Sequence, residues 1–196
     1  MFFVGKGGVG KTSTVAKLSG NSLPSMHSET PGIQTTTIYW PGKIKQLNRS
    51  VIFQLQLWDA GETALKKFDH ILSACTSKTD AIIFLFSFVD KSSFEEVSQQ
   101  ITRYSGPKDN TCKLSGVFHC LDSLLRFDQY AHSEITQRDI RDFEQNWKIP
   151  ILKIRNIPES EARSDFNDVA QVLNILCEHL WHRDILLAGK TGHSTE

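Results

Sequence analysis

The chain has 196 residues, of which 39% are hydrophobic, and its 22 basic and 22 acidic side chains give a formal net charge of zero. A chain of this length can bury one full hydrophobic core. The balanced charge gives no support for nucleic acid or an anionic membrane as the main partner, and no apolar run approaches the roughly 20 residues of a membrane span.

The cysteines and the two chain ends suggest a reduced, cytoplasmic protein without a lipid anchor. None of the four cysteines (Cys75, Cys112, Cys120 and Cys177) forms a C-x-x-C pair. The C-terminal "AGKTGHSTE" contains no cysteine for prenylation. Only Met1–Val4 precede the first glycine, so we expect a truncated first strand and a longer natural chain.

The first elements are a short apolar strand (Phe2–Val4), a glycine-rich loop and a helix from Lys11 to about Ser19. The loop completes the pattern G-x-x-x-x-G-K-[ST], in which backbone N–H groups surround phosphates, the lysine reaches the outer phosphates and the hydroxyl binds Mg²⁺. We therefore predict that the phosphates are bound by Gly5, Gly7, Gly8, Val9, Gly10, Lys11, Thr12 and Ser13.

The middle of the chain predicts a hairpin and then a buried strand. After a polar loop, Ile33–Trp40 and Val51–Trp58 read as paired strands joined by a turn over 41–50. A helix is expected over about 64–77. The run Ala81–Val89 is apolar on both faces, as a central parallel strand should be.

The second half predicts helices over 93–104 and 135–147, a strand over 149–154 and a closing helix over Phe166–Trp181. Thr136 and Asp139 have the spacing of a helix N-terminal cap. Residues 112–130 should supply a further strand but are interrupted, so Leu114–Leu125 is either a true insertion or a sequence error.

The alternation of strands and helices predicts one α/β domain over residues 1–196. The expected fold is that of a P-loop NTPase: a mostly parallel sheet with one antiparallel edge hairpin and helices on both faces.

Two further segments complete a predicted nucleotide switch. Thr30 follows Lys11 by nineteen residues, where a mobile-loop threonine would bind Mg²⁺ and the γ-phosphate. Asp59 ends an apolar strand, where ligands gather in α/β folds, and Gly61 follows it at the γ-phosphate. The predicted Mg²⁺ ligands are thus Thr12, Thr30 and Asp59.

Guanine recognition has a weaker signal. The usual [NT]-K-x-D is represented only by "LRFD", in which Arg126 replaces the lysine and Asp128 would accept from the base.

These motifs resemble the Rab-like small GTPases over nearly the full chain. "TPGIQT" is similar to the first switch, "LWDAGE" to W-D-T-A-G-Q-E, and "FLFSFVDKSSFEEV" to the fourth strand and third helix. More closely, "GIQTT", "WDAGE", "FDQY" and "LWH" resemble the divergent GTPase branch of the ciliogenesis and planar cell polarity effector complex.

The resemblance implies Mg²⁺ with GTP or GDP as cofactors. It also implies Inturned and Fuzzy as partners, in cargo and membrane trafficking, including exocytosis, at the cytoskeleton of the ciliary basal body. The chain departs from the family pattern at Asp59–Gly61, which is one residue short, and at Glu62, which stands in for the catalytic glutamine. Slow hydrolysis is therefore expected. The S-A-K element is missing from "KIRNIP", where Asn156 would contribute to guanine binding.

Several alternatives stay open. Lys6 gives the loop the second lysine of a deviant ATPase, but no strand-end aspartate follows at the right interval, so we expect a solvated side chain. A nucleotide-free scaffold and an efficient self-inactivating GTPase are the other competitors. Cys177, His179 and His182 would need a fourth ligand to hold zinc. Trp40 and Trp58 are either core residues or part of an effector surface.

Overall fold

The computed structural model describes residues 1–24, 26, 28–44, 48–67, 78–104, 118–119, 135–154 and 162–191. Within these ranges the elements are, in chain order, β1 (Phe2–Gly5), α1 (Lys11–Leu18), β2 (Ile33–Ile44), β3 (Arg49–Ala60), α2 (Glu62–Lys67), β4 (Ile82–Phe86), α4 (Lys91–Tyr104), β5 (Phe118–His119), α5 (Gln137–Trp147) and α6 (Ala162–Thr191).

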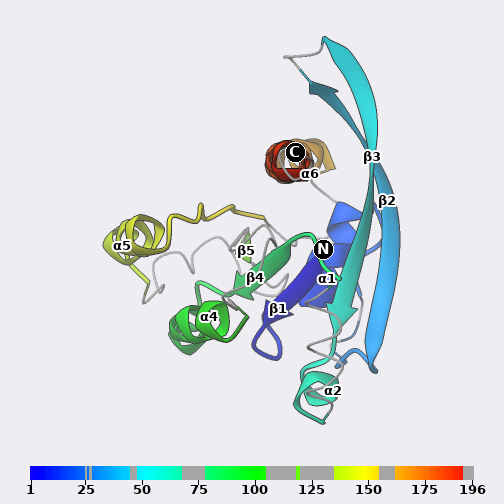
Figure 1. Ribbon diagram of the computed structural model, residues 1–196. Helices are drawn as coiled ribbons and strands as arrows, with labels where there is room; N and C mark the ends of the chain where they lie inside the picture. The colour runs from blue at the N-terminus through cyan, green and yellow to red at the C-terminus, as the bar shows by residue number, and fades with distance from the viewer. Residues whose placement is uncertain are drawn as a thin grey trace.

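The strands form one sheet in the order β2-β3-β1-β4-β5 (Figure 1). Strand β1 pairs in parallel with both β3 and β4, and β4 pairs in parallel with β5. Only β2 and β3 are antiparallel within the described sheet. This arrangement confirms the predicted α/β fold class, a mostly parallel sheet with one antiparallel edge hairpin.

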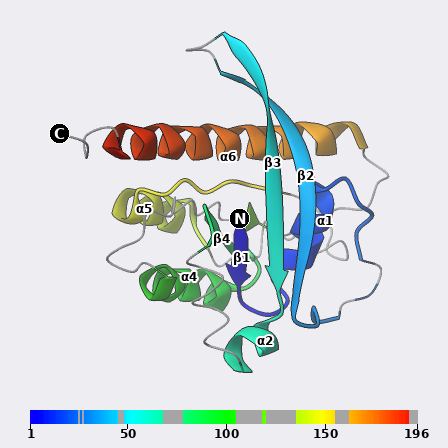
Figure 2. The ribbon, with the colours of Figure 1, turned by 45° about the vertical axis from the view of Figure 1, so that its right-hand side comes forward.

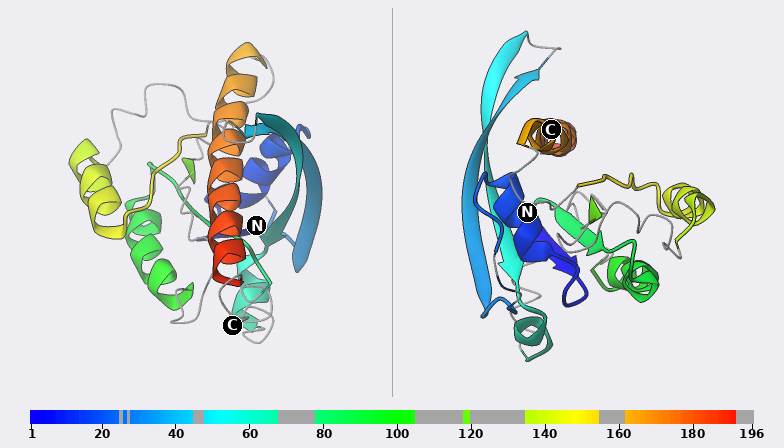
Figure 3. Two further views of the ribbon diagram at one scale, coloured as in Figure 1. Left: turned by 45° about the horizontal axis from the view of Figure 1, so that its top comes forward. Right: turned by 180° about the vertical axis from the view of Figure 1, so that it is seen from behind.

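Alternate residues of the central strands enter two separate cores. Phe3 of β1 and Ile83 of β4 pack with α1 and α6, whereas Phe2 and Phe84 pack with α4 and α5. Figures 1 and 3 show these two helix pairs on opposite sides of the sheet. Because both faces of β1 and β4 are covered, their sequences are apolar throughout.

The hairpin is longer than the sequence predicted. Strand β2 continues through Pro41 to Ile44, and Pro41 lies opposite Ile52 in the register. A proline is tolerated here because β2 is an edge strand and needs no N–H on its outer side. Figure 2 shows the hairpin crossing α6 and continuing beyond it. At this crossing Trp40 Nε1 donates to Asn174 Oδ1 at 2.8 Å.

The predicted strand over 149–154 is wrong. It contains a single bridge residue, Lys153, although Leu152 and Ile154 are buried against α1 and α6. The N–H of Ile151 donates to Glu144 Oε1 at 2.8 Å. A side chain thus satisfies a backbone donor that a strand would have paired in a ladder.

The helices follow the predicted periodicity, with shifted ends. Helix α6 extends beyond the predicted Phe166–Trp181 at both ends, and α2 begins at Glu62. The predicted cap of α5 is confirmed, since the Asp139 N–H donates to Thr136 Oγ1 at 3.2 Å and the Thr136 N–H donates to Asp139 Oδ2 at 2.7 Å. No helix in the described ranges is long and apolar enough to span a membrane.

Parts of two predicted elements lie outside the described residues. These are residues 68–77 of the predicted second helix and all of 112–130 except Phe118–His119. The alternative of an insertion or a sequence error at Leu114–Leu125 therefore stays open.

Candidate functional site

The loop between β1 and α1, residues Gly5–Thr12, is termed the phosphate loop below. Gly8 and Gly10 adopt φ values of 81° and 86°, the left-handed region that favours glycine. Gly10 is also the N-cap of α1. The buried side chain of Val9 anchors the loop to the core, while Gly7 and Gly8 are exposed. The loop thus lies at the N-terminus of a helix, where anions are favoured, with two of its glycines exposed to solvent.

Lys11 is folded back over this loop. It is the first residue of α1 and only 8% exposed. Its Nζ donates to the carbonyl oxygens of Gly5 at 2.9 Å and of Lys6 at 3.1 Å. Ser13, the third residue of the helix, is partly buried in the same turn. The ammonium group is therefore held beside the loop rather than extended into solvent.

Three predicted Mg²⁺ ligands lie together although they come from three different segments. Thr12 Oγ1 donates to Asp59 Oδ2 at 2.6 Å, and Thr30 Oγ1 donates to the same oxygen at 3.0 Å. The two hydroxyl oxygens are 2.8 Å apart. Helix α1, the loop before β2 and the end of β3 thus direct three oxygen atoms to one point.

The chemistry of these oxygen atoms suits a magnesium ion. Asp59 is 2% exposed, and its Oδ1 has no hydrogen-bond partner within the described part of the chain. A buried carboxylate oxygen without a partner is costly, and a hard divalent cation would satisfy it. Thr12, Thr30 and Asp59 therefore fit Mg²⁺, with nucleotide phosphates and water supplying the remaining oxygen ligands.

The segment after β3 closes against the segment before β2. The Gly61 N–H donates to the carbonyl oxygen of Gly32 at 2.9 Å. Glu62, the first residue of α2, reaches the phosphate loop, where its Oε2 accepts from the Gly7 N–H at 2.6 Å. Thr30 and Glu62 thus each contact a residue of the phosphate loop, and Gly61 contacts the segment that carries Thr30, while their roles as switch residues stay predictions.

Glu29 contributes a contact that the sequence analysis missed. Its Oε2 accepts from the Thr63 hydroxyl at 2.8 Å, and its Oε1 accepts from the Thr63 backbone N–H. These hydrogen bonds hold the pKa of Glu29 below its ordinary value. The carboxylate satisfies a backbone donor in the first turn of α2. Its only signal in the sequence was an acidic residue next to Thr30.

The Lys6 side chain is 35% exposed, as expected for a solvated loop residue, but it is also paired across the surface. Its Nζ donates to Asp90 Oδ2 at 2.9 Å and to Ser92 Oγ at 2.6 Å. The hydrogen bond to Asp90 raises the pKa of Lys6, and hydrogen bonds from Ser92 and then Lys6 lower the pKa of Asp90. In the sequence, the run "DKSS" was the feature that could have indicated this contact. Its Asp90 also accepts from the Ser93 N–H at 3.1 Å. Lys6 therefore ties the phosphate loop to the start of α4.

The sequence analysis also named guanine contacts, a zinc alternative and two tryptophans. Arg126, Asp128 and Asn156 lie outside the described residues, so guanine binding stays a prediction. Burial raises the pKa of the Cys177 thiol to about 12, which disfavours the thiolate that zinc requires. The described ranges contain no group of three or more His, Cys, Asp or Glu side chains placed to hold a metal. Trp40 and Trp58 are partly buried and pack against the two cores.

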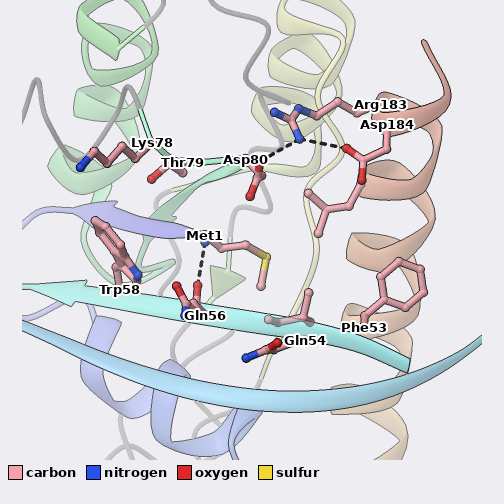
Figure 4. Close-up of a pocket in the computed structure, with 12 residues that line it drawn as sticks. Met1, Phe53, Gln54, Gln56, Trp58, Lys78, Thr79, Asp80, Arg183 and Asp184 are labelled. Atoms are coloured by element: carbon pink, nitrogen blue, oxygen red, sulfur yellow. Dashed lines mark hydrogen bonds and ion pairs between the residues drawn. The ribbon is translucent and has the colours of Figure 1, made fainter. Parts of the chain in front are cut away.

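A cavity of about 340 Å³ lies at the opposite end of the sheet, between the start of β1 and the C-terminal part of α6 (Figure 4). There the Met1 amino group donates to the Gln56 carbonyl oxygen at 2.7 Å, and Arg183 contacts Asp80 at 2.8 Å and Asp184 at 3.1 Å. None of the described phosphate-loop residues lines this cavity. It is therefore separate from the candidate site.

Comparison with known proteins agrees with this geometry. The sequence matches the Ras family over residues 1–174. It is 46% identical to ciliogenesis and planar polarity effector 2 of Xenopus laevis, covering 98% of this chain and 78% of that protein. The human protein of the same name is 43% identical over 96% of this chain and 74% of its own length, and the Danio rerio protein is 39% identical over 100% and 73%. The chain therefore belongs to the Ras family, and its sequence is similar along almost its whole length to proteins named as ciliogenesis and planar polarity effectors.

Proposed function

We propose that residues 1–196 act as one GTPase domain that binds GTP and GDP with Mg²⁺ and serves as a switch or scaffold in cilium assembly. The observation that carries this proposal is the meeting of Thr12, Thr30 and Asp59 beside the phosphate loop. An intact loop alone is common to ATP and GTP proteins. The contact of Thr30 with the strand-end aspartate supports a nucleotide-dependent switch, because the γ-phosphate and Mg²⁺ order loops at such a position in GTPases.

The roles of the residues follow from their positions. The backbone from Gly5 to Gly10 and the ammonium group of Lys11 would bind the phosphates, with Ser13 in the same helical turn. Bound Mg²⁺ would neutralise phosphate charge, held by the hydroxyls of Thr12 and Thr30 and by Asp59. Gly61 would sense the outer phosphate, while Arg126, Asp128 and Asn156 remain the proposed guanine contacts.

We propose that hydrolysis without a partner is slow. Ras itself turns over at only about 3–5 × 10⁻⁴ s⁻¹ with a glutamine that orients the attacking water. Glu62 stands at the corresponding place, and its carboxylate side chain can accept hydrogen bonds but has no N–H to donate. It is also engaged with the Gly7 N–H. Steady turnover near 1 s⁻¹ without an added activator would contradict this proposal.

The cellular role rests on similarity. The names of the relatives associate them with ciliogenesis and planar polarity. We propose that this chain works in the same process, through proteins of the Inturned and Fuzzy type, in cargo and membrane trafficking at the ciliary base. Pull-down of these two proteins should be stronger with a GTP analogue than with GDP, and equal recovery would indicate a constitutive scaffold.

The direct test is to identify the nucleotide that the protein binds. Purified protein would be denatured and the released small molecules separated and identified. In parallel, thermal unfolding would be followed with GTP, GDP or ATP in excess Mg²⁺. A ligand at 100 times its Kd adds about 2.7 kcal/mol of stability, which is a measurable rise in Tm.

The variant Lys11→Ala should abolish the rise in Tm, because it removes the cation of the phosphate loop. Lys153→Ala is the matched control, since Lys153 is exposed and lies on neither switch segment. A rise that persists in Lys11→Ala would exclude the phosphate loop as the site. A rise with ATP as large as with GTP would favour the ATPase alternative, and no rise with any nucleotide would favour a nucleotide-free scaffold.

A further inference from the structure

Glu62 places a carboxylate inside the phosphate loop. Its Oε2 accepts a hydrogen bond from the Gly7 N–H at 2.6 Å. The contact is so close that a Cβ added at Gly7 would overlap this oxygen. The loop therefore already binds one anionic oxygen through a backbone donor of the kind that it uses for phosphate.

The peptide group that donates this hydrogen bond also contacts Lys11. The carbonyl oxygen of Lys6 accepts from Lys11 Nζ at 3.1 Å, and the N–H of the same peptide group belongs to Gly7. In loops of this pattern the lysine reaches the outer phosphates. Only one peptide group therefore separates the Glu62 carboxylate from the lysine of the outer-phosphate end.

The backbone on either side of Glu62 is anchored at this end of the site. The preceding residue, Gly61, donates to the Gly32 carbonyl oxygen at 2.9 Å, and the following residue, Thr63, donates to Glu29 through both its backbone and its side chain. Both contacts hold the first turn of α2 against the segment before β2, whose Thr30 contacts Thr12 of the phosphate loop. The backbone contacts on both sides of Glu62 therefore position its carboxylate at the phosphate loop.

We propose that Glu62 is an internal anion that lowers the affinity of the site for GTP relative to GDP; this inference rests on the proposed nucleotide binding. GTP carries one more phosphoryl group than GDP, at the outer end. The carboxylate must either leave the Gly7 N–H or remain close to this added negative charge, and both alternatives cost free energy. GDP brings no phosphoryl group to the outer end and avoids most of this cost. Glu62 is thus a specificity-determining residue that biases the resting protein toward the GDP state.

The test is to measure Kd for fluorescent GDP and for a fluorescent, non-hydrolysable GTP analogue in excess Mg²⁺. The proteins compared are the wild type, Glu62→Gln, Glu62→Ala and the control Glu178→Gln. Glu178 is exposed on α6, so its variant makes the same change of charge on another surface. Both Glu62 variants should improve the affinity for the GTP analogue about tenfold relative to GDP, equivalent to about 1.4 kcal/mol. The Glu178 variant should not change this ratio.

Ionic strength provides a second measurement. Because the effect is one of charge near the surface, added salt should reduce the wild-type preference for GDP and leave the ratio in Glu62→Ala nearly constant. If both nucleotides bind and the ratio is the same in all four proteins, the inference is overturned while the proposed function stands. If neither nucleotide binds any of the proteins, the proposed function fails and the inference fails with it.

Discussion

The hydroxyl of Thr12 donates to Asp59 Oδ2 at 2.6 Å, joining the first turn of α1 to the end of β3. Both side chains are oxygen ligands of the kind that Mg²⁺ prefers, and the second oxygen of Asp59 is buried without a partner in the described part of the structure. A bound cation would replace this hydrogen bond with stronger contacts to the same atoms. The pair is therefore the most direct place to test the role of the metal.

We expect Asp59→Asn to weaken the Mg²⁺ dependence of nucleotide binding. The substitution removes the negative charge that faces the cation. The loss of one charged buried partner is worth about 1–3 kcal/mol, or roughly fivefold to 150-fold in affinity. The measurement is nucleotide dissociation over a titration of Mg²⁺. Asp142→Asn, on the exposed face of α5, is the matched control. An unchanged Mg²⁺ requirement in Asp59→Asn would exclude Asp59 from the metal site.

We expect the contact between Glu29 and Thr63 to be lost only in acid. The Thr63 hydrogen bonds lower the folded-state pKa of Glu29 from its ordinary value of 4.5. The stabilisation is therefore fully present above pH 4.5 and is lost as the pH falls through the lowered folded value. The measurement is the NMR shift of the Thr63 amide between pH 7 and pH 3.

The Thr63 amide signal also provides a control when Glu29 itself is replaced. Glu29→Ala should displace the Thr63 amide signal already at pH 7 and remove most of its dependence on acid. Glu95→Gln is the control, because Glu95 is an exposed residue of α4, and it should leave the titration as in the wild type. A midpoint above 4.5, or a wild-type titration in Glu29→Ala, would show that Glu29 does not bind this amide in solution.

The hairpin should be tethered to α6 by the indole of Trp40. Trp40→Phe keeps an aromatic ring near Phe166 but removes the hydrogen bond to Asn174. We expect a loss of about 0.5–1.5 kcal/mol in the free energy of unfolding. The measurement is urea unfolding of both single variants and of Trp40→Phe with Asn174→Ala.

The control for this cycle is Trp181→Phe, because Trp181 Nε1 has no hydrogen-bond partner within the described residues. Its effect should add to that of Asn174→Ala, whereas the effects of Trp40→Phe and Asn174→Ala should not add. Simple additivity in both pairs would mean that the indole hydrogen bond contributes nothing measurable.

Base selection should depend on Asp128. A carboxylate that accepts from the guanine N1–H and exocyclic amine is left unpaired by adenine, so GTP should compete better than ATP. Asp128→Asn should weaken GTP and improve xanthosine triphosphate, whose base presents an acceptor in place of the amine. The measurement is competition binding with the three nucleotides. Equal competition by ATP and GTP in the wild type would contradict guanine recognition.

The features that the sequence predicted well depend on local spacing. The phosphate loop follows from one eight-residue pattern, and the α5 cap follows from Thr136 and Asp139 three positions apart. The apolar run Ala81–Val89 predicted a strand covered on both faces, and the observed strand within it is shorter, Ile82–Phe86. Here neighbouring residues determine the backbone conformation, so the sequence contains the necessary information.

The features that the sequence missed depend on distant partners. Pro41 normally ends a strand, and only its edge position allows β2 to continue. Residues 149–154 are rich in isoleucine and were predicted to form a strand, but the Ile151 N–H donates to the Glu144 side chain. The contacts of Lys6 with Asp90 and of Glu29 with Thr63 join segments that only the folded sheet brings together. Their residue types alone did not identify these partners.

The antiparallel hairpin also has a consequence for the order of folding. Its twelve register pairs connect strands that are adjacent in the chain, so closing it costs little loop entropy. Strands β1 and β4 pair in parallel but are separated by most of the first half of the chain. Their pairing therefore has to close a much larger loop. We expect hydrogen-exchange pulse labelling during refolding to protect the amides of β2 and β3 before those of β1. The phosphate loop would then form late, after the hairpin already exists, and earlier protection of β1 would contradict this order.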